Sequence, residues 1–407
     1  MRRFFKFLGK GLLALLSLII IVFSSFRVKE HFNGNDFIPY LEKNIESSSD
    51  PEDLSFELMK KDIQSSKLIL VGEIHGFQDA TKFDPVFFSF LRKNFSVEHF
   101  LVEMDFAQAH YLNVYNKTGN EQLLDEVLSN WVVSIGRKSV DYKNKFKKLR
   151  RVYLNDGEFT YYGNNNISDI HLVRRFSNEV LNQTFNLELQ ENDSILLVNT
   201  KERFMRSQVP NELIWLADYV LNNLEYSLVE KNREEILTEN LLALYDRYDL
   251  TNEKVFGSYG LGHTVLAPFK SGYKSMAARF VELRPEFKDE ILSTNFVFLD
   301  SQMSVFSKTL PSFMQDEGDY TNISVSYDNI FMSYLYGIDD LRRVTSEKSF
   351  NLIKLNSTGS PYKKSKRLSS MFKILPFGQV VNAGENNVTS DYYDYLILVR
   401  NSEGLRF

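Results

Sequence analysis

The sequence predicts an α/β protein with a mainly parallel central sheet that is flanked by helices on both faces. Short apolar runs recur from Lys67 onward, and stretches with helical periodicity lie between them. The composition agrees with this prediction, because 43% hydrophobic and 25% charged residues over 407 positions are typical of a globular protein with a sizeable core.

Residues 1–27 are interpreted as a membrane anchor or a signal segment. The segment begins with four basic residues, Arg2, Arg3, Lys6 and Lys10. Residues 11–26 are uncharged and almost wholly apolar, and a run of this length is short but usable for a spanning helix, which usually needs about 20 residues. The basic flank is expected to stay in the cytoplasm, which places the rest of the chain outside it, on the periplasmic side of the inner membrane in a Gram-negative cell. Ser24 and Ser25 leave signal cleavage and export open as the alternative.

Residues 28–66 are expected to form a linker and a first helix, and residues 67–407 a single α/β domain. The candidate strands are Leu68–Val71, His99–Val102, Phe159–Tyr162, Ile195–Val198, Val255–Ser258, Phe296–Leu299 and Tyr395–Val399. Helical spacing relates Phe146, Leu149 and Tyr153, and again Leu237, Leu241, Leu244 and Tyr248. Residues 301–373 are weakly patterned, so a lid, an insertion and irregular edge structure all stay open.

Charge and cysteine content exclude several classes of function. The net charge of -5 gives no reason to expect a nucleic-acid partner, and the basic stretches Lys143–Arg151 and Lys363–Arg367 are interpreted as solvated faces. The chain has no cysteine, which excludes disulfides, thiolate catalysis and zinc–thiolate sites. The sequence also lacks the H-E-x-x-H motif of zincins, the G-x-S-x-G elbow of serine hydrolases and a complete phosphate-binding loop.

Ionisable residues follow three of the predicted strands. Glu73 and His75 follow the first, Glu103 follows the second, and His263 follows the strand that begins at Val255. Because parallel sheets bind ligands beyond the carboxyl ends of their strands, these four side chains are expected to form one site. Each also has a structural explanation, such as a turn for Glu73 and His75 or a helix cap for Glu103.

At these residues the chain resembles the erythromycin esterase-like family, and the wider superfamily with the ChaN-like haem-binding and Tiki/TraB-type proteins. The resemblance rests on V-G-E-I-H-G at 71–76, L-V-E-M-D-F-A-Q-A at 101–109, R-E-E-I-L-T-E-N-L at 233–241 and G-L-G-H at 260–263. It implies that Glu73, His75, Glu103 and His263 form the catalytic centre. In macrolide esterases the histidine usually stands three residues after the glutamate, whereas here it stands two after, as in the ChaN-like branch.

Arg233 matches an arginine of the family on the helix before the last histidine. Asn240 lies on the same helical face two turns later, so both are expected to bind substrate or to support the site, and a purely bracing role stays open.

Two functions follow from this sequence. The first is a hydrolase of an ester, lactone or amide in a small-molecule or peptide substrate. A histidine would activate water, or the same four residues would hold a divalent zinc, manganese or iron ion that does so. The alternative, which the ChaN-like resemblance implies, is a haem- or ligand-binding protein without catalysis.

Overall fold

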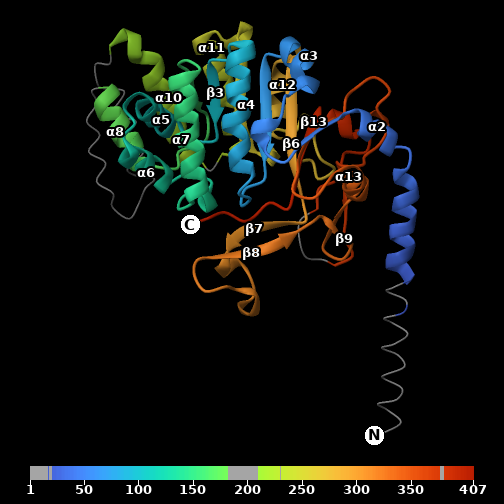
Figure 1. Cartoon of the computed structure of the whole chain (residues 1–407). Helices are drawn as coiled ribbons and strands as arrows, with labels where there is room; N and C mark the ends of the chain where they lie inside the picture. The colour runs from blue at the N-terminus through green and yellow to red at the C-terminus, as the bar shows by residue number, and fades with distance from the viewer. Residues whose placement is uncertain (1–16, 18–20, 182–209, 230, 376–379) are drawn as a thin grey trace.

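The computed structural model describes residue 17 and residues 21–181, 210–229, 231–375 and 380–407 (Figure 1). Within this part of the chain the main sheet has eight strands in the order β1-β11-β13-β6-β2-β5-β3-β4. Neighbouring strands from β13 to β4 are parallel, whereas β11 runs antiparallel to both β1 and β13. The predicted fold class, with a mainly parallel sheet, is confirmed, and one edge of the sheet is antiparallel.

The strands that carry the functional residues lie where the apolar runs predict them. The parallel strands are β2 (Leu68–Glu73), β3 (His99–Val102), β4 (Thr160–Gly163), β5 (Val255–Gly260), β6 (Ile291–Leu299) and β13 (Tyr395–Arg400). Residues 28–66 contribute more than a linker and a helix, because β1 (Ile45–Ser48) pairs with β11 (Phe350–Lys354) at the sheet edge. The candidate strand at 195–198 lies outside the described residues.

Helices cover the sheet on both faces (Figure 1). On one face lie α4 (Ala80–Phe95) and α7 (Val140–Asn155), and on the other α11 (Arg233–Tyr248) and α12 (Met276–Leu283). Successive residues of β5 point to opposite faces of the sheet. Ser258 forms a hydrogen bond with Asp84 of α4 on one face. Tyr259 forms one with Asn164 on the other face, and Asn164 donates to the carbonyl oxygen of Leu237 in α11. The remaining helices are α2 (Ile38–Lys43), α3 (Glu57–Ser65), α5 (Phe106–Thr118), α6 (Glu121–Ser129), α8 (Ile170–Val180), α10 (Ile214–Leu228) and α13 (Ile338–Val344).

Two hydrophobic cores meet at strands β6 and β13. In β6, Phe296 and Phe298 belong to the main core beneath α4, where Phe83 packs edge-on against Phe296 at 5.4 Å. The alternate residues Val297 and Leu299 belong to a second core, built largely from the C-terminal third of the chain. This period-2 alternation is expected for a strand buried on both faces.

Residues 301–373 form several distinct elements. Strands β7 (Ser301–Phe306) and β8 (Tyr320–Val325) make a hairpin that projects below the main sheet in Figure 1. Strands β9 (Asp328–Asn329), β10 (Ser333–Leu335) and β12 (Met371–Phe372) form a small second sheet. The same region supplies α13 and the main-sheet strand β11, so most of it belongs to the body of the fold.

The described N-terminal residues are docked on that body. Residues 21–34 are helical, and Phe26 stacks on Phe372 at 5.6 Å. Glu30 pairs with Arg367, which also pairs with Asp340, each at 2.8 Å. The interpretation of the second basic stretch as solvated is therefore wrong at Arg367, whose burial is balanced by two carboxylates.

The predicted anchor falls mostly outside the described residues, which omit 1–16 and 18–20. Among the helices that the structure does describe, none has both the length and the apolar character needed to span a membrane. The anchor stays a prediction.

Candidate active site

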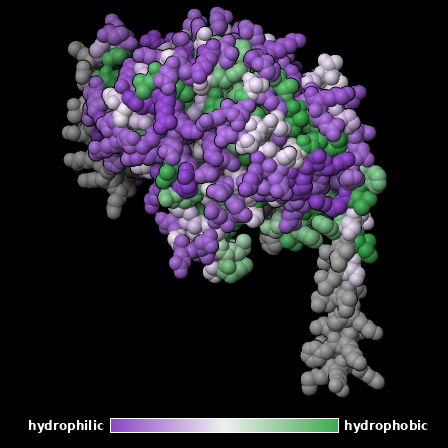
Figure 2. Space-filling model, viewed as in Figure 1, coloured by the Kyte–Doolittle hydropathy of each residue, from purple (hydrophilic) through white to green (hydrophobic). Residues whose placement is uncertain are grey.

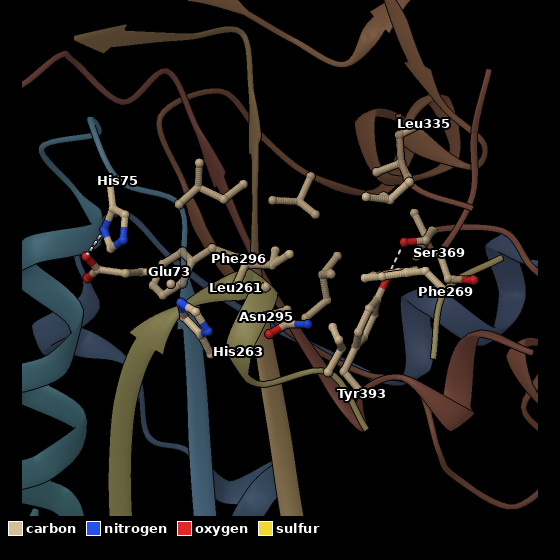
Figure 3. Close-up of a pocket in the computed structure, with 18 of the residues that line it drawn as sticks. Glu73, His75, Leu261, His263, Phe269, Asn295, Phe296, Leu335, Ser369 and Tyr393 are labelled. Atoms are coloured by element: carbon tan, nitrogen blue, oxygen red, sulfur yellow. Dashed lines mark hydrogen bonds and ion pairs between the residues drawn. The ribbon is translucent and has the colours of Figure 1, made fainter. Parts of the chain in front are cut away.

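The four predicted residues meet at the carboxyl edge of the sheet. Glu73 ends β2, Glu103 follows β3, and His263 lies in the turn after β5, the strand between those two. His75 Nε2 lies 3.7 Å from Glu103 Oε2, and His263 Nε2 lies 3.6 Å from Glu103 Oε1. The two imidazoles thus approach one carboxylate from different sides. Figure 3 shows Glu73, His75 and His263 at one end of a cavity.

Gly260 explains how these side chains come so close. A Cβ atom at this position would lie 3.0 Å from His75 Nε2 and 3.5 Å from Glu103 Oε2. The glycine at the end of β5 therefore leaves the space that the functional groups occupy.

The buried carboxylate of Glu73 contacts three hydrogen-bonding side chains. Its Oε1 accepts from Tyr142 Oη at 2.5 Å and faces His75 Nδ1 at 2.7 Å, while Oε2 accepts from Lys145 Nζ at 3.1 Å. Burial alone would raise the pKa of Glu73, but the charge of Lys145 and the hydrogen bonds lower it to about 2. Glu73 is therefore a fixed anion behind His75.

Lys145 connects Glu73 to a second buried acid. Its Nζ lies 2.5 Å from Asp84 Oδ2, which also accepts from Ser258 Oγ. Burial raises the pKa of Asp84, against the effect of Lys145. The interpretation of Lys143–Arg151 as a solvated face is wrong at Lys145, whose side chain is 5% exposed. The helical spacing of α7 could have indicated that Lys145 is buried, because Tyr142 and Lys145 lie on the inward face of the helix with Phe146.

His75 is the most accessible of the four residues, with a side chain 28% exposed. Since Nδ1 faces the Glu73 carboxylate, that nitrogen carries the proton, and Nε2 is left to act toward the cavity. Burial lowers the pKa of His75, but Glu73 and Glu103 outweigh it and raise that pKa above its usual value.

Glu103 stands between the two imidazoles. Its Oε2 accepts from the backbone N–H of Gly260 at 2.5 Å, and its Oε1 accepts from Arg233 Nη2, also at 2.5 Å. Burial opposes ionisation, but the nearby His263 imidazole and the charges of His75 and Arg233 hold the pKa of Glu103 well below its usual range. The predicted placement of Arg233 at the site agrees with this contact.

His263 faces carboxylates on both ring nitrogens. Besides Glu103 near Nε2, Glu234 Oε1 lies 2.7 Å from Nδ1. Burial lowers the pKa of His263, but the two carboxylates raise it to about 9, so this imidazole is protonated at neutral pH. The sequence prediction missed Glu234, although it stands next to Arg233 in the first turn of α11, where its Oε2 also accepts from the backbone of Met276.

Asn240 does not line the cavity. It is 2% exposed, donates to the carbonyl oxygen of Asn164 and pairs with Asn223. It lies seven positions after Arg233 in the helix, a rise of about 10 Å, which places it beside the sheet. Its role is to brace the chain after β4.

The four residues do not fit the metal site considered from the sequence. Both oxygens of Glu73 and both of Glu103 already accept hydrogen bonds, and two of the donors are the cations of Lys145 and Arg233. His263 would also have to lose its proton to become a ligand. Across the described part of the chain no group of three or more histidines and carboxylates has a geometry suited to a metal ion.

The cavity that these residues border has a volume of about 450 Å³. Glu73, His75, Glu103, Arg233 and His263 line one end of it. In Figure 3 the labelled residues Leu335, Phe269 and Tyr393 lie at the opposite end, and Asn295 lies between the two ends. The volume falls within the range of about 300–1,000 Å³ that is usual for small-molecule sites.

Comparisons with known proteins identify the fold. No protein-family model matches the sequence, and no curated protein matches it. The structure is similar to that of a succinoglycan biosynthesis protein, with a TM-score of 0.63 and 13% identity, over 91% of this chain and 98% of the other. It is also similar to an erythromycin esterase mutant, EreC in its open conformation, with a TM-score of 0.59 and 12% identity, over 87% of this chain and 96% of the other.

The haem-binding ChaN protein of Campylobacter jejuni aligns with a TM-score of only 0.33 and 16% identity, over 70% of this chain and 98% of the other. That score supports no conclusion about haem. Likeness at 12% identity shows the fold alone. The predicted resemblance to the erythromycin esterase-like proteins is thereby confirmed at the level of the fold.

Proposed function

We propose that this protein hydrolyses an ester, lactone or amide bond with His75 as the general base and His263 as a protonated partner. The observation that supports this proposal is the pair of imidazoles in unlike surroundings at one end of a cavity. Each ring lies near two carboxylates, but the Glu73 carboxylate beside His75 also pairs with Lys145, whereas His263 lies between Glu103 and Glu234. An acid–base pair requires two titratable groups that hold different protonation states, and unlike surroundings are the usual way to obtain them.

In the proposed reaction a water molecule binds between His75 Nε2 and the substrate carbonyl carbon. His75 takes one proton from the water as its oxygen bonds to the carbonyl carbon, and Glu73 stabilises the imidazolium that forms. The proton on His263 and the guanidinium of Arg233 offset the charge that develops on the carbonyl oxygen. When the bond to the alcohol or amine breaks, the leaving group receives the proton from His75.

A screen of ester, lactone and amide substrates with the full-length protein tests this proposal. Turnover in the wild type, lost in a folded His75→Ala variant, is the expected result. No turnover of any substrate, together with a Soret band on addition of haemin, would replace hydrolysis by the haem-binding alternative.

We also propose that the domain is held outside the cytoplasm by the N-terminal segment. The basic start and apolar run of residues 1–26 support this location. In the helix of residues 21–34, Ile21, Val28 and Phe32 are 60%, 55% and 66% exposed, and Figure 2 shows hydrophobic residues on the surface at this edge of the molecule. Cell fractionation with protease accessibility checks the proposal, and a soluble protein protected within the cytoplasm would contradict it.

A further inference from the structure

Beyond Asn295 the cavity becomes an apolar recess. We use this name for the part lined by Val265, Val297, Leu335, Leu368, Val381 and Leu396. These residues come from β6, β13, the turn after β5 and the C-terminal segments packed on them. Most of them belong to the second core, and the residues that line this end of the cavity include no charged side chain. A charged group placed here would lose its water without gaining a partner.

Asn295 presents a free donor at the border between the recess and the charged end. The residue is 1% exposed, and its Oδ1 accepts from Thr264 Oγ1 at 2.7 Å. Its Nδ2 is buried and has no hydrogen-bond partner, although the side chain lines the cavity. Buried polar atoms nearly always find a partner, so an unused amide N–H that lies along a cavity indicates a ligand acceptor. Figure 3 shows this amide between His263 and Tyr393.

The two ends of the cavity differ in access. At the charged end His75 and Arg233 are 28% and 37% exposed, so a polar leaving group has a route to solvent there. In the recess Val265, Leu335 and Leu396 are at most 3% exposed. The apolar part that stays behind during the reaction therefore belongs in the recess, and the part that departs belongs at the charged end.

We propose that the substrate is an ester or amide with an apolar acyl chain, which lies in the recess while the acyl carbonyl oxygen accepts a hydrogen bond from Asn295 Nδ2. This inference rests on the proposed hydrolase function and names its substrate class. Asn295 holds the carbonyl between His75 and the recess, and its N–H strengthens its bond to that oxygen as negative charge develops there.

Hydrolysis of p-nitrophenyl acetate, butyrate, octanoate and decanoate by the full-length protein tests the proposal. Each methylene held in an apolar pocket can raise kcat/KM by about tenfold. We therefore expect kcat/KM to rise by at least about 100-fold from acetate to decanoate. Val381→Phe, which narrows the recess from a partly exposed position, should reduce the decanoate-to-acetate ratio by about tenfold or more. Met332→Phe, 43% exposed and outside the cavity lining, is the matched control and should keep the wild-type ratio.

Asn295→Leu keeps the approximate shape but removes the donor, and should lower kcat for every ester by about 100-fold while the chain-length trend remains. Asn295→Asp serves as the second variant if the leucine protein does not fold, as judged by thermal melting. Equal turnover of acetate and decanoate by the wild type would overturn the acyl recess but leave the hydrolase standing.

If no ester is turned over, the proposed hydrolase function is contradicted. Calorimetry with decanoate then tests separately whether the recess binds an apolar chain. Decanoate binding that is weakened in Val381→Phe and retained in Met332→Phe would support a ligand with an apolar chain in the recess. Absence of decanoate binding to the wild type would overturn it.

Discussion

The surroundings of the two active-site histidines differ in how their charge is balanced. Behind His75, the anion of Glu73 is shared with Lys145 and Tyr142, all deeply buried. Around His263, Glu103 and Glu234 both face the ring, and Arg233, which pairs with Glu103, is 37% exposed. The proposed mechanism gives these two chemically identical rings opposite tasks, and the difference between them lies in their neighbours.

The largest expected effect is on the unfolding free energy, and it tests whether Lys145 balances the buried charges of Glu73 and Asp84 behind His75. Lys145→Met leaves Glu73 and Asp84 without their shared cation, and removing one partner of such a buried pair costs about 3–5 kcal/mol of unfolding free energy. Lys143→Met, on the same helix, breaks only the partly exposed pair with Asp125 and should cost about 0–1 kcal/mol. Denaturant unfolding of both variants measures the difference. Equal costs would mean that Lys145 does not balance the two acids.

Removal of the base should nearly abolish activity while the fold survives. His75→Ala is expected to lower turnover by about 100-fold or more, because it removes the proposed base that takes the proton from water. The side chain is partly exposed, so thermal melting should change little. His99→Ala is the matched control, since His99 contacts Tyr162 on β4 and lies outside the site. Full activity in a folded His75→Ala protein would contradict the hydrolytic mechanism.

The pH dependence should be bell-shaped and should separate the two histidines. His75 must be neutral to accept a proton, so kcat/KM rises as the pH passes its pKa, which lies above the usual 6.5. His263 must be protonated, so kcat/KM falls as the pH passes about 9. Glu234→Gln removes one of its two carboxylates and should move the falling limb about 1–2 pH units lower. A rising limb that moves instead would reverse the assigned roles.

The smallest expected effect is that of removing divalent metal ions on kcat. Because the carboxylates are occupied by hydrogen-bond donors and His263 is protonated, prolonged dialysis against EDTA should leave kcat unchanged. Lost activity that returns with zinc, manganese or iron would show that the four residues rearrange around an ion.

The convergence of the four residues could be predicted because each follows a strongly apolar strand. In contrast, β1 and β11 were missed, since I-E-S-S and F-N-L-I-K are short and carry polar residues at positions that the sheet buries or pairs, such as Asn351. The order of strands is also set by long-range packing, which local periodicity does not encode.

The supporting residues were harder to predict for a different reason. Lys145 looks like part of a solvated basic helix until Glu73 and Asp84 are placed beside it. Glu234 looks like an ordinary acid in the first turn of a helix until His263 is brought to it. Their roles depend on tertiary contacts between strands and helices far apart in the chain.

The most direct test of the central claim is an NMR titration of the two active-site imidazoles in the full-length protein. Resonances are assigned with His75→Asn and His263→Asn variants, and thermal melting confirms that both are folded. The pKa of His263 predicts that this ring stays protonated until the pH nears about 9. The proposed mechanism requires His75 to lose its proton first. A neutral His263 at pH 7, or loss of the His263 proton before that of His75, would contradict the division of roles between them.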